Sequence, residues 1–559
     1  MYDVDVLDYK LLTPDQQKKA QYFCKEKYFK YVLELTDRLN FHHRVKYDSK
    51  FWSKALNFWL YRNICITYDK YIALREINLD SFDLSILDES SFTTPKTCDQ
   101  SLKLLSFAPY GVEQLASIYF NLFSSQKIKT FSLKTFDYSC VETGTTPNLK
   151  SISKFDRLIL FFKKLAVKRK IINKLKKGIL RIVNNQFTAK IGLLEAYIST
   201  DFLLSVSFKS LFTIQEIQFP SLGVLKDKAI DEDSRSKIFQ FEKDFDDFDK
   251  YFFESMKSLM PCSFIENFDE IYSLSNDYDN NMSHIISEAW LGNEFLSIKL
   301  AIMQRDNIKH IHTQHGWVHF NSLNLTWLES YLCDVYLTSG FGMSSLPNVE
   351  RGGYVREKYP VIKNKYRDGV VFFSTTSPAY TYQIDENIRD LSFFNYLNKQ
   401  INFIGMLKND LFKEFYYRKY PVDHGWGELG ALTSYFPNLK FDNIHQRGLD
   451  RLINAKLVIF DVFSTGYIEA LIANTPTVII FDKDIRQLSK EFEHLIDRLS
   501  EINIVFYNID DAARHINAVY ENPFKWWDSE EVQREIKIFL ESTARDRKYS
   551  ENYILKLLK

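Results

Sequence analysis

The chain has 559 residues, which is too long for a single hydrophobic core, so we expect two or more domains. Its 72 basic residues balance its 72 acidic residues, so the net charge gives no indication of a nucleic-acid partner. The six cysteines are widely separated, which argues against a disulfide framework and a zinc site and suits a reducing cytoplasm.

Residues 1–100 are expected to form a helical region, because apolar and aromatic side chains recur at helical spacing over 51–74. The acidic start of the chain does not resemble a secretory signal. No stretch reaches the roughly 18 apolar residues that a membrane span needs. We therefore expect a cytoplasmic protein.

Residues 154–183 carry eleven basic side chains and one acidic side chain, with Leu, Ile and Phe between them. This basic amphipathic pattern predicts contact with anionic lipid at the inner face of the cell membrane. A solvated helix beside an acidic face of the same protein accounts for the pattern equally well.

Two regions, 101–350 and 361–520, alternate apolar strand patterns with helical patterns, and 521–559 reads as a helical tail. The predicted strands lie within 307–316, 333–342, 369–382, 400–407, 457–460, 477–481 and 502–507. This alternation indicates parallel βαβ units. The predicted fold is α/β, with two Rossmann-like doubly wound domains facing a cleft and extra helices at both ends.

Ser464, Thr465 and Gly466 stand between a buried strand and a helix, where an open α/β sheet commonly binds phosphate. Their hydroxyls can donate hydrogen bonds, and glycine allows the backbone to approach a ligand closely. Glu469 follows one turn later and could bond a ribose or sugar hydroxyl. The alternative is an N-cap with a capping-box Glu and no ligand.

Two further turns supply candidate phosphate ligands. Arg418 and Pro421 belong to the turn 416–426, and Ser374 and Thr375 follow another predicted strand. Three such turns in one domain favour a shared nucleotide pocket, although each alone could be an ordinary surface loop.

His315 ends the predicted strand 307–316, where it could act as acid, base or phosphate partner. His310 and His312 alternate along that strand and are expected to pack inside. A zinc site from these three histidines is disfavoured, because no Cys or acid is spaced to complete it. Glu288 and Glu294 could supply a catalytic carboxylate, although both also fit a helix start.

Several motifs occur in a fixed order, namely "TQHG", "LTSGFG", "TTSPAY", "YPVDHGW", "FSTGYIEALIANTPTVIIFD" and "WWDSEEVQREIKIF". Together they resemble a family of bacterial transferases encoded with surface-carbohydrate genes. That family is similar to GT-B glycosyltransferases, notably retaining β-Kdo transferases and GT-B sialyltransferases that use CMP-activated ulosonic acids. The resemblance covers roughly residues 265–545.

The resemblance implies that the N-terminal domain binds the acceptor and the C-terminal domain binds the nucleotide. Ser464-Thr465 matches the Ser-Ser/Thr motif that grips CMP in these enzymes. Tyr420-Pro421 stands where they carry His-Pro, and His424 is the one nearby His that could replace the missing side chain. Glu288 is the best match to their carboxylate at the reacting carbon.

We therefore expect a metal-independent GT-B glycosyltransferase with His315 and Glu288 as catalytic residues and no cofactor. Its donor would be a CMP-activated ulosonic acid such as Kdo or a nonulosonate. Its acceptor would be a bacterial surface glycan or a lipid-linked acceptor. The alternatives are a CDP-glycerol-type polyol-phosphate transferase and a non-catalytic sugar-nucleotide-binding scaffold.

Overall fold

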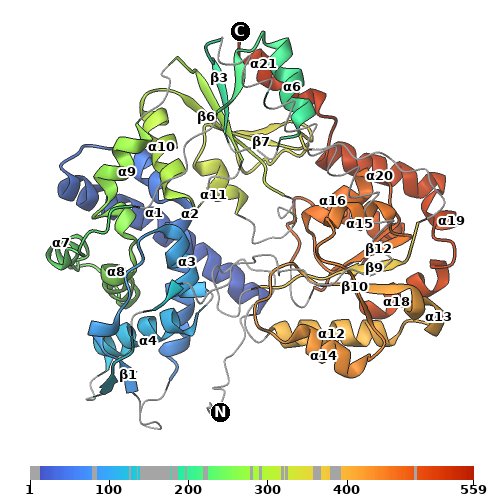
Figure 1. Ribbon diagram of the computed structural model, residues 1–559, viewed down its shortest axis with the longest axis horizontal. Helices are drawn as coiled ribbons and strands as arrows, with labels where there is room; N and C mark the ends of the chain where they lie inside the picture. The colour runs from blue at the N-terminus through green and yellow to red at the C-terminus, as the bar shows by residue number, and fades with distance from the viewer. Residues whose placement is uncertain are drawn as a thin grey trace.

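The computed structural model describes most of the chain. The described residues are 13–77, 85–106, 108–124, 128–134, 136–138, 178, 187–194, 198–217, 225–276, 281–288, 292–316, 320, 325–356, 367–377, 392–483 and 487–559. They form an N-terminal and a C-terminal part, each built around a parallel sheet (Figure 1).

Six described strands form the sheet of the N-terminal part, and every neighbouring pair is parallel. In chain order they are β3 (Ile191–Leu194), β4 (Ile214–Ile217), β5 (His284–Ser287), β6 (Lys309–Thr313), β7 (Val335–Thr338) and β8 (Val349–Arg351). Their order across the sheet is β4-β3-β5-β6-β7-β8, so the winding reverses between β3 and β5. Ligands of open α/β sheets bind beyond the carboxyl ends of strands at such a point.

The described N-terminal helices other than α6 share one hydrophobic core, which runs from α1 to α11 and is continuous across residue 100, whereas α6 packs in a second core with the sheet. Asp48 caps α2 by accepting a hydrogen bond of 2.8 Å from the Phe51 backbone, and α2 then packs on α10. The helices are α1 (Pro14–His43), α2 (Ser49–Leu74), α3 (Cys98–Ser106), α4 (Pro109–Phe123), α6 (Thr200–Lys209), α7 (Glu232–Ile238), α8 (Asp247–Leu259), α9 (Phe268–Ser275), α10 (Glu294–Arg305) and α11 (Thr326–Tyr331). Two short strands, β1 (Ser85–Leu87) and β2 (Lys129–Phe131), pair apart from the main sheet.

The C-terminal sheet is also parallel throughout, with the order β11-β10-β9-β12-β13-β14. Its strands are β9 (Val370–Phe373), β10 (Phe415–Arg418), β11 (Lys440–Phe441), β12 (Leu457–Phe460), β13 (Thr477–Ile480) and β14 (Val505–Phe506). Its helices are α12 (Ser392–Gly405), α13 (Asn409–Glu414), α14 (Glu428–Tyr435), α15 (Gly448–Asn454), α16 (Thr465–Ile472), α17 (Glu493–Glu501) and α18 (Ile509–Val519). Here the winding reverses between β9 and β12. The predicted fold class, α/β with two doubly wound parallel sheets, is confirmed.

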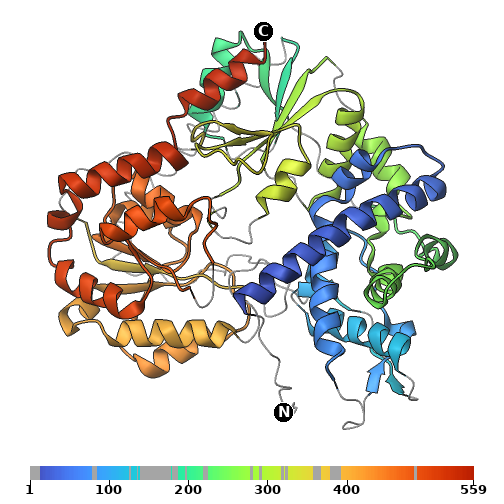
Figure 2. The same cartoon turned by 180° about the vertical axis from the view of Figure 1, so that it is seen from behind.

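The C-terminal helices connect the two parts. They are α19 (Phe524–Trp527), α20 (Glu530–Thr543) and α21 (Lys548–Lys556). Helix α20 packs on α16 and α17, whereas α21 returns to pack on α6 of the N-terminal part. Helix α1 reaches back in the other direction on the far side of the molecule (Figure 2), where Asp15 accepts a hydrogen bond from Gln487.

One predicted strand is wrong. Residues 400–407 end helix α12 and the turn after it, and the strand of this βαβ unit is β10. The run "INFI" is apolar, but Phe393, Leu397, Ile401 and Ile404 are buried along one face of a 3.6-residue period. A short apolar run does not distinguish a buried strand from a helix end.

The basic stretch 154–183 lies outside the described residues apart from Gly178, so its membrane contact stays a prediction. Within the described residues, no helix combines the length and apolarity needed to cross a bilayer.

Candidate active site

The turn that begins α16 has the geometry expected of an anion-binding corner. Ser464 occupies the N-cap in an extended conformation (φ −121°, ψ 176°), but its side chain accepts no capping hydrogen bond from the helix. Glu469 lies beyond the N3 position, so no capping box forms. Both residues and Thr465 are partly exposed. The hydroxyl at the N-cap is therefore not used for capping, and the helix N-terminus remains accessible.

Gly466 serves a different purpose from the one predicted. A Cβ at this position would lie 2.8 Å from the ring of Phe460, so glycine permits α16 to pack on the end of β12. Its lack of a side chain is explained by this contact with the protein.

The turns after β6 and β12 meet, which brings the two sheets together at their carboxyl ends. Gly316 has a φ of +75°, and a Cβ placed there would lie 3.1 Å from Oγ1 of Thr465. His315 is therefore adjacent in sequence to the point where the N-terminal part touches the start of α16.

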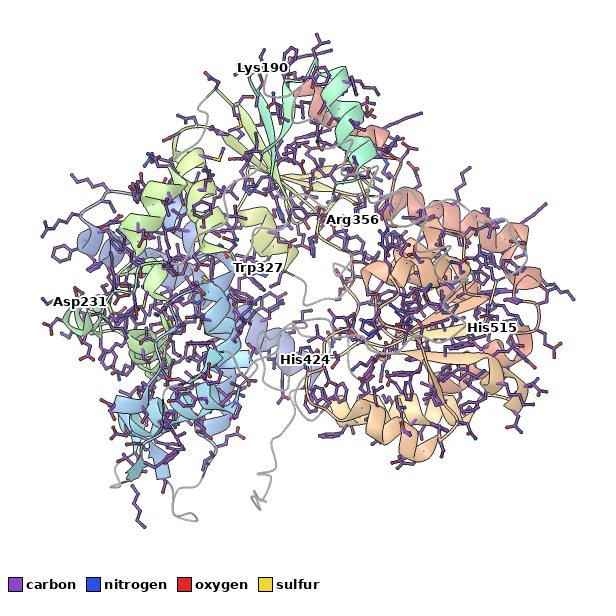
Figure 3. The ribbon with its side chains drawn as sticks, in the orientation of Figure 1. Lys190, Asp231, Trp327, Arg356, His424 and His515 are labelled. Atoms are coloured by element: carbon purple, nitrogen blue, oxygen red, sulfur yellow. The ribbon has the colours of Figure 1, made fainter. Side chains whose placement is uncertain are left out.

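Glu288, His315 and Arg356 form a compact charged group on the N-terminal side. Glu288 directly follows β5, at the reversal of the sheet, and its side chain is 1% exposed. His315 Nδ1 lies 3.5 Å from Oε1 of Glu288, while the imidazole as a whole is 51% exposed. The guanidinium of Arg356 donates a short hydrogen bond to the same carboxylate. Figure 3 shows Arg356 at the junction of the two parts.

The electrostatics of this group keep Glu288 ionised. Burial alone would raise the pKa of its carboxyl, but the hydrogen bond from His315 and the charge of Arg356 outweigh burial and hold the pKa below its usual range. Arg356 loses hydration by burial, yet Glu288, and more weakly Glu469 of α16, raise its pKa. One arginine therefore lies within the fields of a carboxylate from each part of the molecule.

Arg418 does not fit the predicted role in phosphate binding. Its guanidinium, 6% exposed as a residue, forms an ion pair with Asp442 and donates to the carbonyl oxygens of Asn443 and Gln446 at 3.0 and 2.6 Å. These partners occupy three of the five N–H donors of its guanidinium from inside the protein. We therefore remove Arg418 from the predicted phosphate ligands.

Ser374 and Thr375 follow strand β9, as predicted, at the reversal of the C-terminal sheet, but their hydrogen bonds are to other protein groups. The Ser374 hydroxyl donates to Oε1 of Glu428 at 3.2 Å, and the backbone of Thr375 exchanges hydrogen bonds with the phenol of Tyr396. Burial raises the pKa of Glu428, although hydrogen bonds from Tyr417 and Ser374 oppose the shift. These hydrogen-bonded polar groups lie at the carboxyl ends of β9 and β10, and we call them the polar floor.

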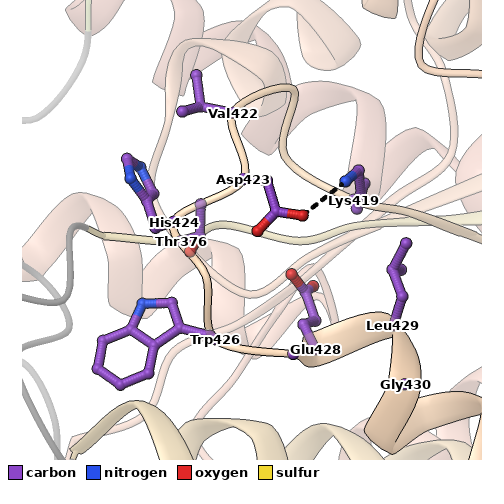
Figure 4. Close-up of a pocket in the computed structure, with 10 residues that line it drawn as sticks. Thr376, Lys419, Val422, Asp423, His424, Trp426, Glu428, Leu429 and Gly430 are labelled. Carbon is purple, nitrogen blue, oxygen red and sulfur yellow. Dashed lines mark hydrogen bonds and ion pairs between the residues drawn. The ribbon is translucent and has the colours of Figure 1, made fainter. Parts of the chain in front are cut away.

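The turn "YPVDHGW" lines a small pocket above this floor (Figure 4). Lys419 pairs with Asp423 at 3.4 Å on one wall, and the Trp426 indole, stacked on Phe393, forms another. The pocket is lined by Thr376, Lys419, Val422, Asp423, His424, Trp426, Gly427, Glu428, Leu429 and Gly430. Pro421 is exposed next to it, and burial lowers the pKa of His424.

The other predicted candidates lie away from this junction. His310 and His312 are buried in the sheet, where His310 bonds Ser287 Oγ at 2.6 Å and Lys54 Nζ at 3.2 Å. Glu294 is buried at the start of α10 and accepts a hydrogen bond from the Cys98 backbone. Among the described residues no group of three or more His, Cys, Asp or Glu side chains is arranged to hold a metal ion.

Comparison with known proteins identifies the family. Residues 2–558 match the family described as LIC12162 family transferase. The chain belongs to this transferase family. No curated protein matches the chain.

Several solved structures resemble this member of the LIC12162 transferase family weakly. The glycotransferase of kitacinnamycin is 11% identical, with 67% of this chain and 100% of that chain covered and a TM-score of 0.34. CalG4, the calicheamicin glycosyltransferase, is 12% identical over 67% and 100% of the two chains, with a TM-score of 0.33. The UDP-GlcNAc 2-epimerase from Neisseria meningitidis is 9% identical over 66% and 98%, with a TM-score of 0.35. Scores this low say nothing about the reaction of the LIC12162 family member.

Two residues of the site in this transferase were not foreseen from the sequence. Arg356 stands in the connection between the two parts, outside any motif, and only the fold brings it to Glu288. Glu428 begins α14 just after "YPVDHGW". An acidic residue in the first turn of a helix, next to a predicted phosphate-binding turn, was the signal that could have identified it.

Proposed function

We propose that this transferase is a metal-independent glycosyltransferase that moves an ulosonic acid, such as Kdo or a nonulosonate, from a CMP-activated donor. Its acceptor would be a bacterial surface glycan or a lipid-linked precursor of one. The observation that supports the proposal best is the close approach of Gly316 to Thr465 at the start of α16, since Gly316 follows His315, which pairs with Glu288. In the proposed reaction, this junction is the place where the base and the donor phosphate would face each other.

The proposed base is His315. If its Nδ1–H donates to Glu288, the half-exposed ring presents Nε2 as a proton acceptor, and the buried carboxylate stabilises the imidazolium that results. Glu288 is too enclosed to reach a sugar carbon itself, so we assign it to orienting His315. This differs from the predicted role of a carboxylate at the reacting carbon.

The proposed transfer replaces one bond at the anomeric carbon of the donor by another. The acceptor hydroxyl gives its proton to His315 Nε2 and its oxygen forms a bond to the anomeric carbon of the donor. The bond between that carbon and the phosphate oxygen breaks, and CMP leaves with the electron pair. The N–H groups at the start of α16, with Ser464 and Thr465, would stabilise the negative charge on the phosphate.

The CMP assignment is carried over from the resemblance of Ser464-Thr465 and Tyr420-Pro421 to CMP-gripping motifs. Glu469, partly exposed on α16, would bond the ribose or the sugar. Ser374 and Thr375, at the neighbouring strand end, would close the nucleotide pocket. A lipid-linked acceptor fits the prediction that 154–183 contacts anionic membrane. If that prediction holds, charge reversal within Lys163–Lys177 should release the protein from anionic vesicles.

A panel of nucleotides tests the proposal. Free CMP should raise the melting temperature more than UMP, AMP or GMP, because a ligand that binds only the folded protein stabilises it in proportion to its occupancy. Donor screening should then detect CMP released from a CMP-ulosonate. The His315–Glu288 pair would also suit polyol-phosphate transfer, in which case CDP-glycerol is consumed instead. Nucleotide binding without turnover of either donor would indicate a non-catalytic scaffold.

A further inference from the structure

Four large apolar side chains form a surface cluster at one end of the N-terminal part. Phe187 precedes β3, Phe208 lies in the last turn of α6, and Leu211 and Phe212 form the turn into β4. Phe187, Phe208 and Leu211 are 47%, 60% and 75% exposed. The Phe212 ring centroid lies 5.4 Å from that of Phe187 and 5.1 Å from that of Phe208, so the cluster, here called the aromatic tip, is continuous.

The backbone of the aromatic tip is strained. Leu211 and Phe212 have φ values of 52° and 61°, two successive left-handed positions that Gly or Asn usually occupies after a helix. The hydrogen bond from Phe212 N to Ser207 O, 2.7 Å long, holds this conformation. Interior packing does not account for Leu, because its side chain faces solvent. Phe212 is partly buried against the core of the sheet, so the exposed Leu211 is the residue that points to a partner outside the chain.

The rim of the aromatic tip is basic. Lys190, labelled in Figure 3, is exposed just before β3, and the Lys209 side chain is 57% exposed, with its ammonium paired to the buried Glu551 at 2.5 Å. Helix α21 packs on α6 and the exposed Lys559 ends the chain on the same side (Figure 1). In sequence, the eleven basic residues of 154–183 directly precede Phe187. An apolar centre within a basic rim matches the acyl boundary and anionic headgroups of a bilayer.

The aromatic tip lies opposite the candidate active site. Phe187 and Phe212 precede β3 and β4, whereas Glu288 and His315 follow β5 and β6, and these strands are parallel. Binding through the tip would therefore leave the junction of the two sheets open. We propose that the aromatic tip inserts into the headgroup and acyl boundary of an anionic bilayer, with Lys190 contacting lipid phosphates.

Cosedimentation of the full chain with vesicles tests this. The vesicles contain phosphatidylcholine with roughly 30% phosphatidylglycerol, an anionic surface of the kind that attracts basic segments. The double substitution Phe208→Ser and Leu211→Ser should weaken binding at least about tenfold, because it removes two exposed apolar anchors. The matched control is Leu33→Ser, which removes a side chain 60% exposed on α1 and should leave binding unchanged. Equal binding of the double variant and the wild type would overturn the proposal.

A fluorescent label on Leu211→Cys, in a Cys140→Ser background, identifies what covers the tip. The five other cysteines are buried. The label should be solvated without vesicles, gain intensity with them and be quenched by brominated lipid. A label already shielded without vesicles would mean that 154–186 or a second copy covers the tip, and would overturn the proposal. A second outcome would also overturn the proposal. In it, charge reversal of Lys163–Lys177 abolishes vesicle binding, and the label never enters lipid. Nucleotide binding should be unchanged in the tip variants, which separates this test from that of the proposed function.

Discussion

The ion pair between Glu288 and Arg356 provides the sharpest stability prediction. The substitution Arg356→Met removes the cation and retains the volume of the side chain. Glu288, 1% exposed, would then lose its arginine partner and keep its interaction with His315. Removing one member of a buried ion pair costs about 3 kcal/mol, because it leaves a buried charge uncompensated. Removing both charges together with Arg356→Met and Glu288→Gln should cost much less than the sum of the two single changes.

The pH dependence of the same variants follows from the pKa of Glu288. That pKa is lowered in the folded protein, so the ion pair stabilises the fold at pH values above the unfolded pKa, and this contribution is lost as pH falls through the folded pKa. In Arg356→Met, the cation that opposes the effect of burial on Glu288 is lost, so the pKa of Glu288 rises and protonation begins at a higher pH. The stability of this variant should therefore change with pH in a range of pH values in which the stability of the wild type is still constant.

The assay is thermal unfolding of the wild type, both single variants and the double variant, between mildly acidic and neutral pH. Arg351→Met is the matched control, because Arg351 lies nearby and bonds only the Gly340 carbonyl oxygen among its described partners. Non-additive losses from the two charge removals, with little effect in the control, are expected. Strictly additive losses would refute the inference that Arg356 and Glu288 act as a coupled pair.

Three shorter predictions concern the site. Ser464→Ala should weaken nucleotide binding roughly tenfold in calorimetry, because it removes one hydrogen bond to a charged group, and an unchanged affinity would put the phosphate elsewhere. His315→Gln should lower kcat about 100-fold or more with a smaller change in KM, as expected for loss of a general base; a change in KM alone would argue for binding only. Arg418→Met should lower the melting temperature while leaving nucleotide affinity intact, since its partners are Asp442 and two carbonyl oxygens; lost affinity with unchanged stability would restore it as a ligand.

Strand and helix placement could largely be predicted where an apolar run ended in a polar turn. The runs that became β6, β9, β12 and β13 were all found in this way, and each is buried on both faces of a parallel sheet. The prediction failed at 400–407, because "INFI" belongs to a helical face whose other members lie upstream. The four-residue run alone does not contain that information, whereas residues 392–404 read together show the helical period.

The site could be predicted only in part. Ser464 and Ser374 were found because each belongs to a hydroxyl-bearing turn that directly follows an apolar strand pattern. Arg418 looked like a free cation beside a turn, since nothing local shows that Asp442 and two carbonyls enclose it. Arg356 could not be found, because its function as a partner of Glu288 arises only when the connection between the parts folds back.

Calorimetric titration of CMP into the wild type and into the Ser464→Ala variant tests the central claim most directly. We predict a single CMP site in the wild type and an affinity reduced roughly tenfold in the variant, as expected when one charge-assisted hydrogen bond is lost. No heat of binding with CMP, or identical affinities in the two proteins, would contradict the assignment of this corner as the seat of the donor phosphate.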